Sequence, residues 1–328
     1  MIRSIKRCFF LATLGLLGGC VDGADEVWID YHETLAQALD AAPIERQAPE
    51  NIGAFVDRRE RLIAIPEVRE SMLNVYALRE CNITSLVAAR NNQLGRVAPP
   101  SQHWLYERTL WQRLTRCTEG DIVGSLGAED RARLEALTAL KTEQLPAVGW
   151  NALFDSEEWE KNFSRASDPL DPRDLPDPAA ALAALDYLTT MVERTYSLSW
   201  QADSATLEGH LKVLQRRPLV AEVLRSLQLG YTRLNEANRL LARHLESNQC
   251  LPAWETAALD ELTALSRRVL SAVNALIAAH EVTPPSAVVA YQRRWLSLEE
   301  AAAPWERFQA ARLEHTVLRA HFPRCAAG

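Results

Sequence analysis

The chain has 328 residues, of which 48% are hydrophobic and 24% are charged. These proportions are ordinary for a folded globular protein, so they exclude a largely disordered chain, a collagen-like chain and a membrane protein with several spans. With a formal net charge of −7, the chain also lacks the positive balance that is typical of a nucleic-acid-binding protein.

Residues 1–19 have the pattern of a secretory signal peptide. Three basic residues, Arg3, Lys6 and Arg7, come first, and a mainly apolar stretch follows over residues 8–17. This stretch is shorter than the ~20 residues that a helix needs to span a bilayer. A charged start, a short apolar middle and small residues at the end are typical of a segment that is removed after export.

The segment ends in Leu17-Gly18-Gly19-Cys20, which resembles the lipobox of bacterial lipoproteins. The resemblance implies that Cys20 is lipidated and becomes the new N-terminus, with residues 20–24 as a tether to the membrane. Val21 rather than Asp follows the cysteine, which by analogy favours the outer membrane, facing the periplasm. The alternative is an ordinary signal peptide or a short anchor with an incidental cysteine. No later segment looks long and apolar enough to span a membrane.

Cleavage before Cys20 would change both the charge and the cysteine count. Three basic residues and no acidic one would be removed, which takes the net charge from −7 to −10. This value argues against nucleic acid as a partner and against a basic patch that holds anionic lipid. Four cysteines remain, and in an oxidising compartment they predict two disulfides, with three pairings open and no spacing typical of zinc. They are Cys81, Cys117, Cys250 and Cys325.

The spacing of apolar residues predicts an all-α fold. In the first half, helices are expected over residues 25–39, 66–94, 102–117 and 128–145. Pro99 and Pro100 interrupt the pattern between the second and third of these helices. Ser101 follows them and is placed to cap the third helix at its N-terminus.

Residues 167–178 read SDPLDPRDLPDP, and four prolines in twelve residues exclude a regular helix. This Asp/Pro segment is the best internal boundary, between an N-terminal helical half, residues 25–166, and a C-terminal helical half, residues 179–328. It joins either two domains or two layers of a single domain. Its aspartates resemble calcium ligands, but the intervening prolines and the lack of an EF-hand pattern favour a solvated linker.

The second half has a more regular pattern. Helices are expected over residues 178–196, 206–214, 219–246, 252–280 and 297–321. In two of them, apolar residues alternate at spacings of four and three, which favours long antiparallel helices packed as a bundle. An intermolecular coiled coil is the alternative. Asn238 falls on one apolar stripe, where a side-chain hydrogen bond between helices would fix their register.

Two charged residues fall on apolar helix faces on either side of the proline turn. Arg90 lies on the stripe of the helix before the turn, and Glu107 lies on the stripe of the helix after it. In an antiparallel hairpin, facing residues have a nearly constant sum of positions. The pair Arg90 and Glu107 and the pair Cys81 and Cys117 have position sums that differ by only one. One register therefore selects the first disulfide, and elimination gives the second: Cys81–Cys117 and Cys250–Cys325.

The polar cluster around these charges has two interpretations. In the first, Arg90 and Glu107 form a buried ion pair, and neighbouring polar residues satisfy their remaining hydrogen-bonding groups. In the second, the cluster lines a pocket that opens to a ligand or a partner. The predicted cluster consists of Arg90, Asn91, Asn92, Ser101, His103 and Glu107.

The same region resembles a known family. The residues that carry the resemblance are Leu78-Arg79-Glu80-Cys81, the stretch 89–96, Pro100-Ser101 and Tyr106-Glu107. They resemble an uncharacterised family of proteobacterial lipoproteins, domain-of-unknown-function family 3080, and the resemblance covers most of the chain after the signal segment. It implies an envelope location and supports the lipobox. It implies no activity, substrate or cofactor.

No enzyme motif stands out in the sequence. The phosphate-binding patterns GxxxxGK[ST] and GxGxxG, the metal-binding pattern HExxH and the nucleophile pattern GxSxG are all absent. We therefore expect no cofactor, no metal and no catalytic residue. The expected function is a membrane-anchored scaffold, adaptor or ligand-binding module of the cell envelope, with an envelope protein or a small ligand as its partner. The alternative is an envelope hydrolase with Glu107 as general acid or base.

Overall fold

The computed structural model describes residues 23–325. The predicted signal peptide, residues 1–19, and the predicted lipidation site, Cys20, lie outside the described residues. Within the described range the chain is helical, and an isolated bridge between Leu251 and Arg324 is the one extended pairing there. The predicted all-α fold class is therefore confirmed.

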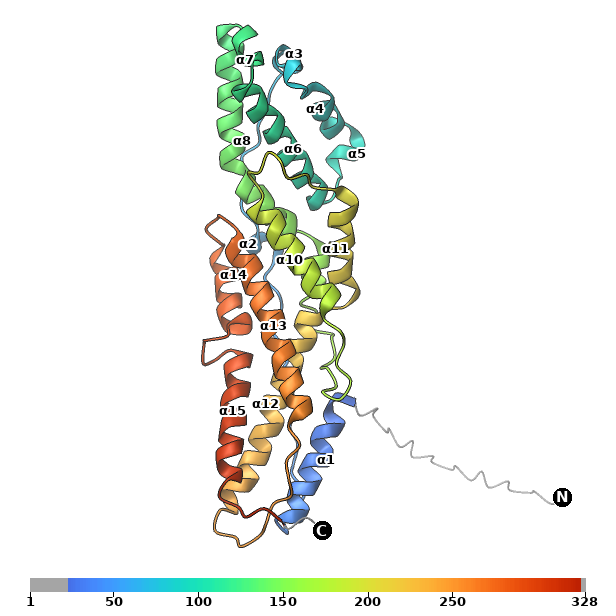
Figure 1. The fold of residues 1–328 in the computed structure, drawn as a ribbon, viewed down its shortest axis with the longest axis vertical. Helices are drawn as coiled ribbons and strands as arrows, with labels where there is room; N and C mark the ends of the chain where they lie inside the picture. Colours follow the sequence, from blue (N-terminus) through green and yellow to red (C-terminus); the bar gives the residue numbers. More distant parts are fainter. Residues whose placement is uncertain (1–22, 326–328) are drawn as a thin grey trace, which may run out of the picture.

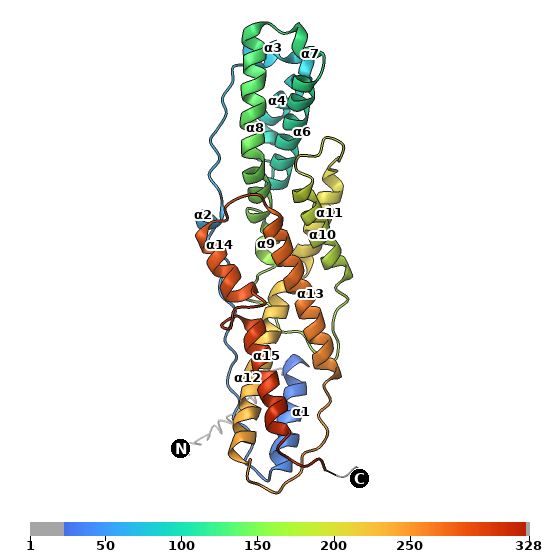
Figure 2. The same ribbon diagram turned by 60° about the vertical axis from the view of Figure 1, so that its left-hand side comes forward.

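The helices form an elongated bundle with three levels along its long axis (Figures 1 and 2). The lower level holds α1 (Gly23–Ala38), α12 (Leu219–Arg243) and α15 (Pro304–Arg319). The middle level holds α2 (Arg58–Arg61), α9 (Glu157–Lys161), α10 (Ala179–Glu193), α11 (Ser204–Arg216), α14 (Ser286–Tyr291) and the π-helical turn η2 (Gln292–Leu296). The long helix α13 (Ala257–Ala279) begins in the lower level and ends in the middle level (Figure 1).

The upper level is a helical hairpin with a cover of short helices. Its two arms are α6 (Pro100–Glu119) and α8 (Ala128–Phe154), and α7 (Ile122–Ser125) lies in the connection between them. The cover comes from the preceding part of the chain and consists of α3 (Met72–Ala77), the 3₁₀ turn η1 (Arg79–Cys81), α4 (Thr84–Asn91) and α5 (Gln93–Arg96). Residues 72–96 therefore pack against the two long helices that follow them in the chain.

Helix α12 is the central helix of the lower level and packs against both α15 and α1 (Figure 1). Asn238 lies on this stripe, and its side-chain amide donates a hydrogen bond to the carbonyl oxygen of Ala311 in α15 at 3.0 Å. Its side-chain oxygen accepts a hydrogen bond from Nδ1 of the fully buried His315 at 2.6 Å. The predicted polar contact between helices is therefore confirmed, and it fixes the register of α12 against α15.

One large core cluster extends through the lower and middle levels and reaches the base of the hairpin. Buried residues from both sides of the Asp/Pro segment contribute to it, among them Trp104, Trp150, Leu188, Leu224 and Phe308. A second, smaller cluster fills the upper part of the hairpin beneath the cover. The space between α6, α8 and the cover is thus closed at its inner end by a core of its own.

One described helix, α13, is long and apolar enough to cross a membrane by length and composition. The expectation that no later segment reaches this threshold was wrong for that helix. In the fold, Leu259, Leu262, Val269 and Val273 are buried in the large core cluster. The apolar composition of α13 therefore matches its position as a core helix.

The expected helix over residues 66–94 was wrong. Residues 66–71 are irregular, and the remainder is divided among α3, η1, α4 and α5. Asn82 interrupts the path with a left-handed backbone at φ 58°, and Asn92 interrupts it again with an extended backbone at ψ 172°. The side-chain oxygen of Asn92 then accepts a hydrogen bond from the backbone N–H of Gly95 at 2.8 Å. Short polar side chains here compete with the helical backbone pattern.

Several helix ends also differ from the expected ones; α13, for example, begins at Ala257 and not at residue 252. Pro99 occupies the N-cap position of α6, so Ser101 lies inside that helix instead of capping it. Helix α8 continues through Pro146 to Phe154, past the expected end at residue 145. The last expected helix, residues 297–321, starts later than predicted, because α15 begins only at Pro304. The hydroxyl of Ser297 instead accepts hydrogen bonds from the two glutamate N–H groups that follow it, at 3.1 and 3.0 Å, within the turn before α15.

Candidate functional site

The site is built on the two arms of the hairpin, which run antiparallel. The indole N–H of Trp111 in α6 donates a hydrogen bond to the hydroxyl of Thr142 in α8 at 2.9 Å. Further along, the hydroxyls of Thr118 and Thr138 lie 3.1 Å apart. These contacts hold the arms in one register. The side chains of α6 and α8 that face the cover therefore lie side by side.

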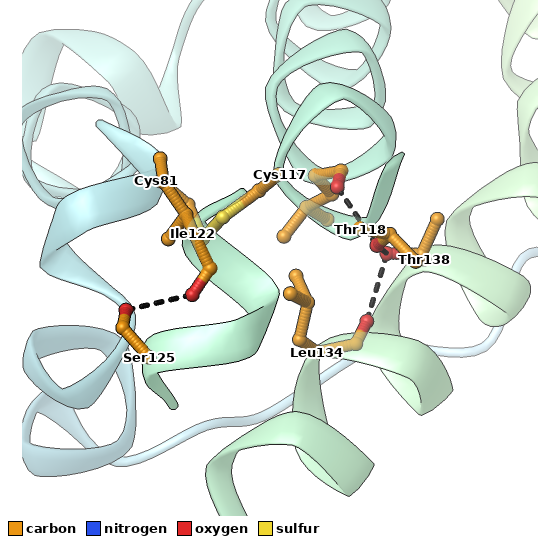
Figure 3. Close-up of a disulfide and its surroundings, with 8 residues drawn as sticks. Cys81, Cys117, Thr118, Ile122, Ser125, Leu134 and Thr138 are labelled. Carbon is orange, nitrogen blue, oxygen red and sulfur yellow. Dashed lines mark hydrogen bonds between the residues drawn. A yellow bond between two sulfur atoms is a disulfide. The ribbon is translucent and has the colours of Figure 1, made fainter. Parts of the chain in front are cut away.

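The cover is joined to α6 by a disulfide. Cys81 of η1 bonds to Cys117 of α6, and their Cα atoms are 5.3 Å apart. Figure 3 shows this bond beside the hydrogen-bonded threonines that link α6 and α8. The second disulfide, Cys250–Cys325, joins the chain before α13 to the segment after α15. Both predicted pairings are therefore confirmed.

A cavity of about 1040 Å³ lies between the cover and the hairpin arms, and we call it the hairpin groove. Its walls are residues 65–70, α4 with α5, and the facing sides of α6 and α8. Along α6 the wall residues recur at helical spacing, because positions three and four apart share a face. They are Pro100, His103, Tyr106, Glu107, Leu110 and Leu114.

Charged residues gather toward one end of the groove, and apolar residues line both ends. The end near the disulfide is apolar, with Leu110 and Leu114 from α6 and Leu137 from α8. The end near the proline turn is polar and charged, with His103 from α6 and with Arg90 and Arg96 from the cover. The groove therefore offers two different chemical environments to one ligand.

An ion pair lies between these two ends. The ammonium group of Lys141 in α8 lies 2.7 Å from a carboxylate oxygen of Glu107 in α6. Both side chains are largely buried, with 11% of Lys141 and 22% of Glu107 exposed. Two further pairs near the mouth, Arg69 with Glu67 and Arg58 with Asp155, are more exposed and contribute little to stability.

Arg90 also lines the groove, and no carboxylate of the described residues pairs with it. Its guanidinium donates to the carbonyl oxygen of Gly95 at 2.8 Å and to Nδ1 of His103 at 3.0 Å. Because an arginine can only donate, Nδ1 is the acceptor and the ring proton of His103 lies on Nε2. Burial, followed by the charge of Arg90, lowers the pKa of His103, which agrees with a neutral ring.

Tyr106 completes this polar end. Its ring lies under the guanidinium of Arg90, 5.9 Å from ring centre to Cζ. Burial, followed by the charge of Glu107, raises the pKa of Tyr106 to about 12, so its hydroxyl stays protonated. The polar end therefore combines a cation, a neutral imidazole and a hydroxyl that remains able to donate.

The structure brings together four of the six residues of the predicted cluster, because Arg90, Asn91, His103 and Glu107 all line the groove. The other two lie elsewhere. Asn92 caps α5, and the hydroxyl of Ser101 donates to Glu208 of α11 at 2.6 Å. The expected ion pair between Arg90 and Glu107 is also wrong, since each has other polar partners.

Sequence reasoning missed Lys141, the actual partner of Glu107. A signal was present, because Lys141 is one of only four lysines in a chain with 32 arginines. Its position four residues after Leu137 also places it on an apolar stripe of α8. Trp104 and Trp111, which flank Glu107 in sequence, are buried and do not line the groove.

No group of three or more metal-binding side chains gathers anywhere in residues 23–325. The groove offers hydrogen-bonding groups, an ion pair and apolar side chains. Fold and site together define an all-α, disulfide-linked helical protein with a large amphipathic groove in one end.

The chain belongs to the family described as Protein of unknown function (DUF3080), whose family model matches residues 29–326. The expected membership of this family is therefore confirmed. No curated protein and no solved structure matches the chain.

Proposed function

We propose that the chain is a lipid-anchored protein of the bacterial envelope that binds a ligand in its hairpin groove without transforming it. The anchor is Cys20, the fold faces the periplasm, and the outer membrane is the favoured location. Leu17-Gly18-Gly19-Cys20 supports the anchor, and two disulfides support an oxidising compartment. The groove itself carries the binding role.

The volume and the lining of the groove support a binding role. Its volume of about 1040 Å³ lies at the upper limit of pockets that hold small molecules. Its lining combines an apolar end with polar groups held in place by the partners described above, a combination found in ligand sites. A purely structural ion pair between helices would not need such a space beside it.

The anchor is tested by labelling growing cells with an alkyne analogue of palmitate. Wild-type protein should incorporate the label, and Cys20→Ser should not, because the acceptor thiol is gone. Cys8→Ser is the matched control: that cysteine lies in the segment to be removed, so labelling should be unchanged. Label on Cys20→Ser, or an intact mass that retains residues 1–19 in the wild type, would refute the lipoprotein assignment.

Ligand binding is tested by filling the groove from α4. Val87 lines the groove, whereas its neighbour Ala88 is exposed and lies outside the groove lining. Protein purified under native conditions is extracted with solvent, and the extract is analysed by mass spectrometry. Wild type and Ala88→Trp should carry the same small molecule, and Val87→Trp should carry at least about tenfold less. Equal amounts in all three, or none in any, would refute a binding groove.

A hydrolase that uses Glu107 is the second candidate, because this carboxylate faces the groove. The ion pair with Lys141 argues against it, since the ammonium group holds one oxygen of the carboxylate and leaves only the other for a reacting group. The same extraction separates the two roles. An enzyme would accumulate uncleaved substrate in Glu107→Gln relative to wild type, whereas a binding protein would carry the same molecule in both.

A further inference from the structure

The apolar end of the groove is enclosed by the smaller core cluster. Val75, Ile83, Leu110 and Leu114 line the groove and are at most 6% exposed. These residues offer no side-chain polar group to a ligand. The part of a ligand that reaches this end must therefore be apolar.

The groove is long as well as large. His103 and Leu114 line its two ends on the same helix, eleven positions apart. At a rise of ~1.5 Å per residue this separation is about 16 Å. An extended apolar chain can run along this length.

The polar end is suited to an anion. Within the described residues, neither Arg90 nor Arg96 has a carboxylate partner. The guanidinium fork matches the oxygens of a carboxylate or a phosphate, and Tyr106 adds a neutral donor. A carboxylate or phosphate placed here would supply the counter-charge that these two arginines lack.

The cover has the properties of an entrance. Helix α4 has no buried residue, so it packs loosely over the groove. On both sides of Arg96 in sequence, Leu94 and Val97 are 79% and 76% exposed. Met72, Leu73 and Tyr76 of α3 are also exposed, so residues 72–97 carry half of the large exposed apolar side chains of residues 23–325. An apolar rim beside a cation matches a ligand that is itself amphipathic.

We propose that the hairpin groove binds a single-chain amphiphile with an anionic oxygen headgroup. The headgroup lies between Arg90 and Arg96, and the acyl chain runs past the Glu107–Lys141 pair into the core between α4, α6 and α8. This assignment rests on the proposed binding function and names the class of ligand. The carboxylate of a fatty acid and the phosphate of a monoacyl lipid share this chemistry.

The test is photo-crosslinking with the full chain in vesicles of neutral phosphatidylcholine. The probe is palmitate with a diazirine in its chain and a terminal alkyne, and modified peptides are identified by mass spectrometry. Saturable labelling is expected within residues 107–114 of α6 and 137–141 of α8. Labelling spread over exposed surfaces without saturation would overturn the proposal.

Competitors separate the contributions of head and tail. Dodecanoate and dodecyl phosphate should both compete, and the stronger of the two identifies the headgroup. Dodecylamine, with the same tail and a cationic head, should compete at least about tenfold more weakly. Equal competition by the amine would overturn the anionic headgroup, and full competition by inorganic phosphate alone would overturn the acyl chain.

Variants assign the headgroup to its two arginines. Arg90→Gln with Arg96→Gln should reduce saturable labelling at least about tenfold. The matched control is Arg131→Gln with Arg239→Gln, because both of these arginines are exposed and lie outside the groove. If thermal melts show that the first pair of substitutions disturbs folding, Arg96→Gln is tested alone. It should reduce saturable labelling at least about threefold. Unchanged labelling in folded variants would overturn the assignment.

These results also separate the ligand class from the proposed function. If another kind of molecule is extracted from wild type and excluded by Val87→Trp, the groove binds a ligand but the amphiphile assignment fails. If neither an extracted molecule nor saturable labelling is found, both fail.

Discussion

Arg108 is a buried guanidinium whose charge is balanced by carbonyl groups. It is 2% exposed, and no carboxylate of the described residues pairs with it. One of its nitrogens donates to the carbonyl oxygens of Ser197 at 2.7 Å and Trp200 at 2.9 Å, and to that of Arg194 at 3.3 Å. Because Arg194 is the C-cap of α10, the negative end of that helix dipole also faces the cation.

Arg108→Met should therefore destabilise the fold although it keeps most of the side-chain volume. It removes the hydrogen bonds that a buried charged donor makes to three carbonyl groups, which together cost about 3 kcal/mol of the free energy of unfolding. Urea denaturation measures this change. Arg131→Met, at an exposed position, should change the same quantity by less than about 0.5 kcal/mol. Equal values for the two variants would contradict the role given to Arg108.

His280 makes stability depend on pH. It is 6% exposed at the end of α13, with its ring edge-on to Trp150, and burial lowers its pKa to about 4. In the unfolded chain the pKa is about 6.5. Between these values the unfolded state binds the proton and the folded state does not, so stability is lost as pH falls from about 6.5 towards 4.

Between pH 7 and pH 5, this group should lower the free energy of unfolding by about 2 kcal/mol. His280→Leu should remove that part of the pH dependence, because nothing titrates at this position in either state. Urea denaturation at both pH values gives the difference. His321→Leu is the matched control, since His321 is exposed and its variant should retain the wild-type slope. An unchanged slope in His280→Leu would contradict the prediction.

At the level of elements, the Cys81–Cys117 disulfide connects the cover to the hairpin. It closes a loop of 36 residues, for which the loop-entropy estimate is about 4 kcal/mol. Because α4 has no buried residue, this bond is expected to hold the cover in place. Replacing both cysteines with alanine should speed proteolytic cleavage within residues 72–97 at least about tenfold.

The other disulfide supplies the control. Replacing Cys250 and Cys325 with alanine releases a loop at the lower level, so residues 72–97 should remain as protected as in wild type. Limited proteolysis followed by mass spectrometry locates the cuts. Equal cleavage of the cover in both double variants would show that the first disulfide does not secure it.

The long helices and the cysteine pairing were predictable because both follow from periodic spacing. The hydrogen bond from Asn238 to α15 was predictable for the same reason. The polar groups of a side chain on an apolar stripe need hydrogen-bond partners on the neighbouring helix. The cover was not predictable, because Asn82 and Asn92 break its helical periodicity through local backbone geometry. Those breaks do not change the apolar spacing on which the expected helix rested.

The sequence predicted where the candidate site lies, but it did not predict the ion-pair partner of Glu107. The antiparallel register expected about the proline turn placed Arg90 near Glu107, and both residues do line one groove. That register compared only two helices. Lys141 lies in a third helix, α8, and forms the ion pair with Glu107. The groove itself depends on how loosely the cover packs over α6 and α8, and this property has no signature in a sequence pattern.

On the scale of the whole molecule, burial is unevenly distributed between the two ends. Helix α12 has seventeen buried residues, including Leu224, Leu227 and Leu234, whereas α4 has none. Elements with few buried contacts open locally at low free energy, while core helices exchange only near global unfolding. Helix α4 is therefore expected to open locally while α12 stays folded.

Hydrogen exchange measured by mass spectrometry should show this difference directly. Amides in residues 84–97 should exchange at least about a hundredfold faster than amides in the middle of α12, because their opening does not require the core to separate. Helix α6 is the internal control, since it lies under the cover but buries Trp104, Trp111 and Leu114. It should exchange at a rate closer to that of α12. Uniform slow exchange across all three segments would mean that the cover is as firmly packed as the core, which would contradict its role as an entrance.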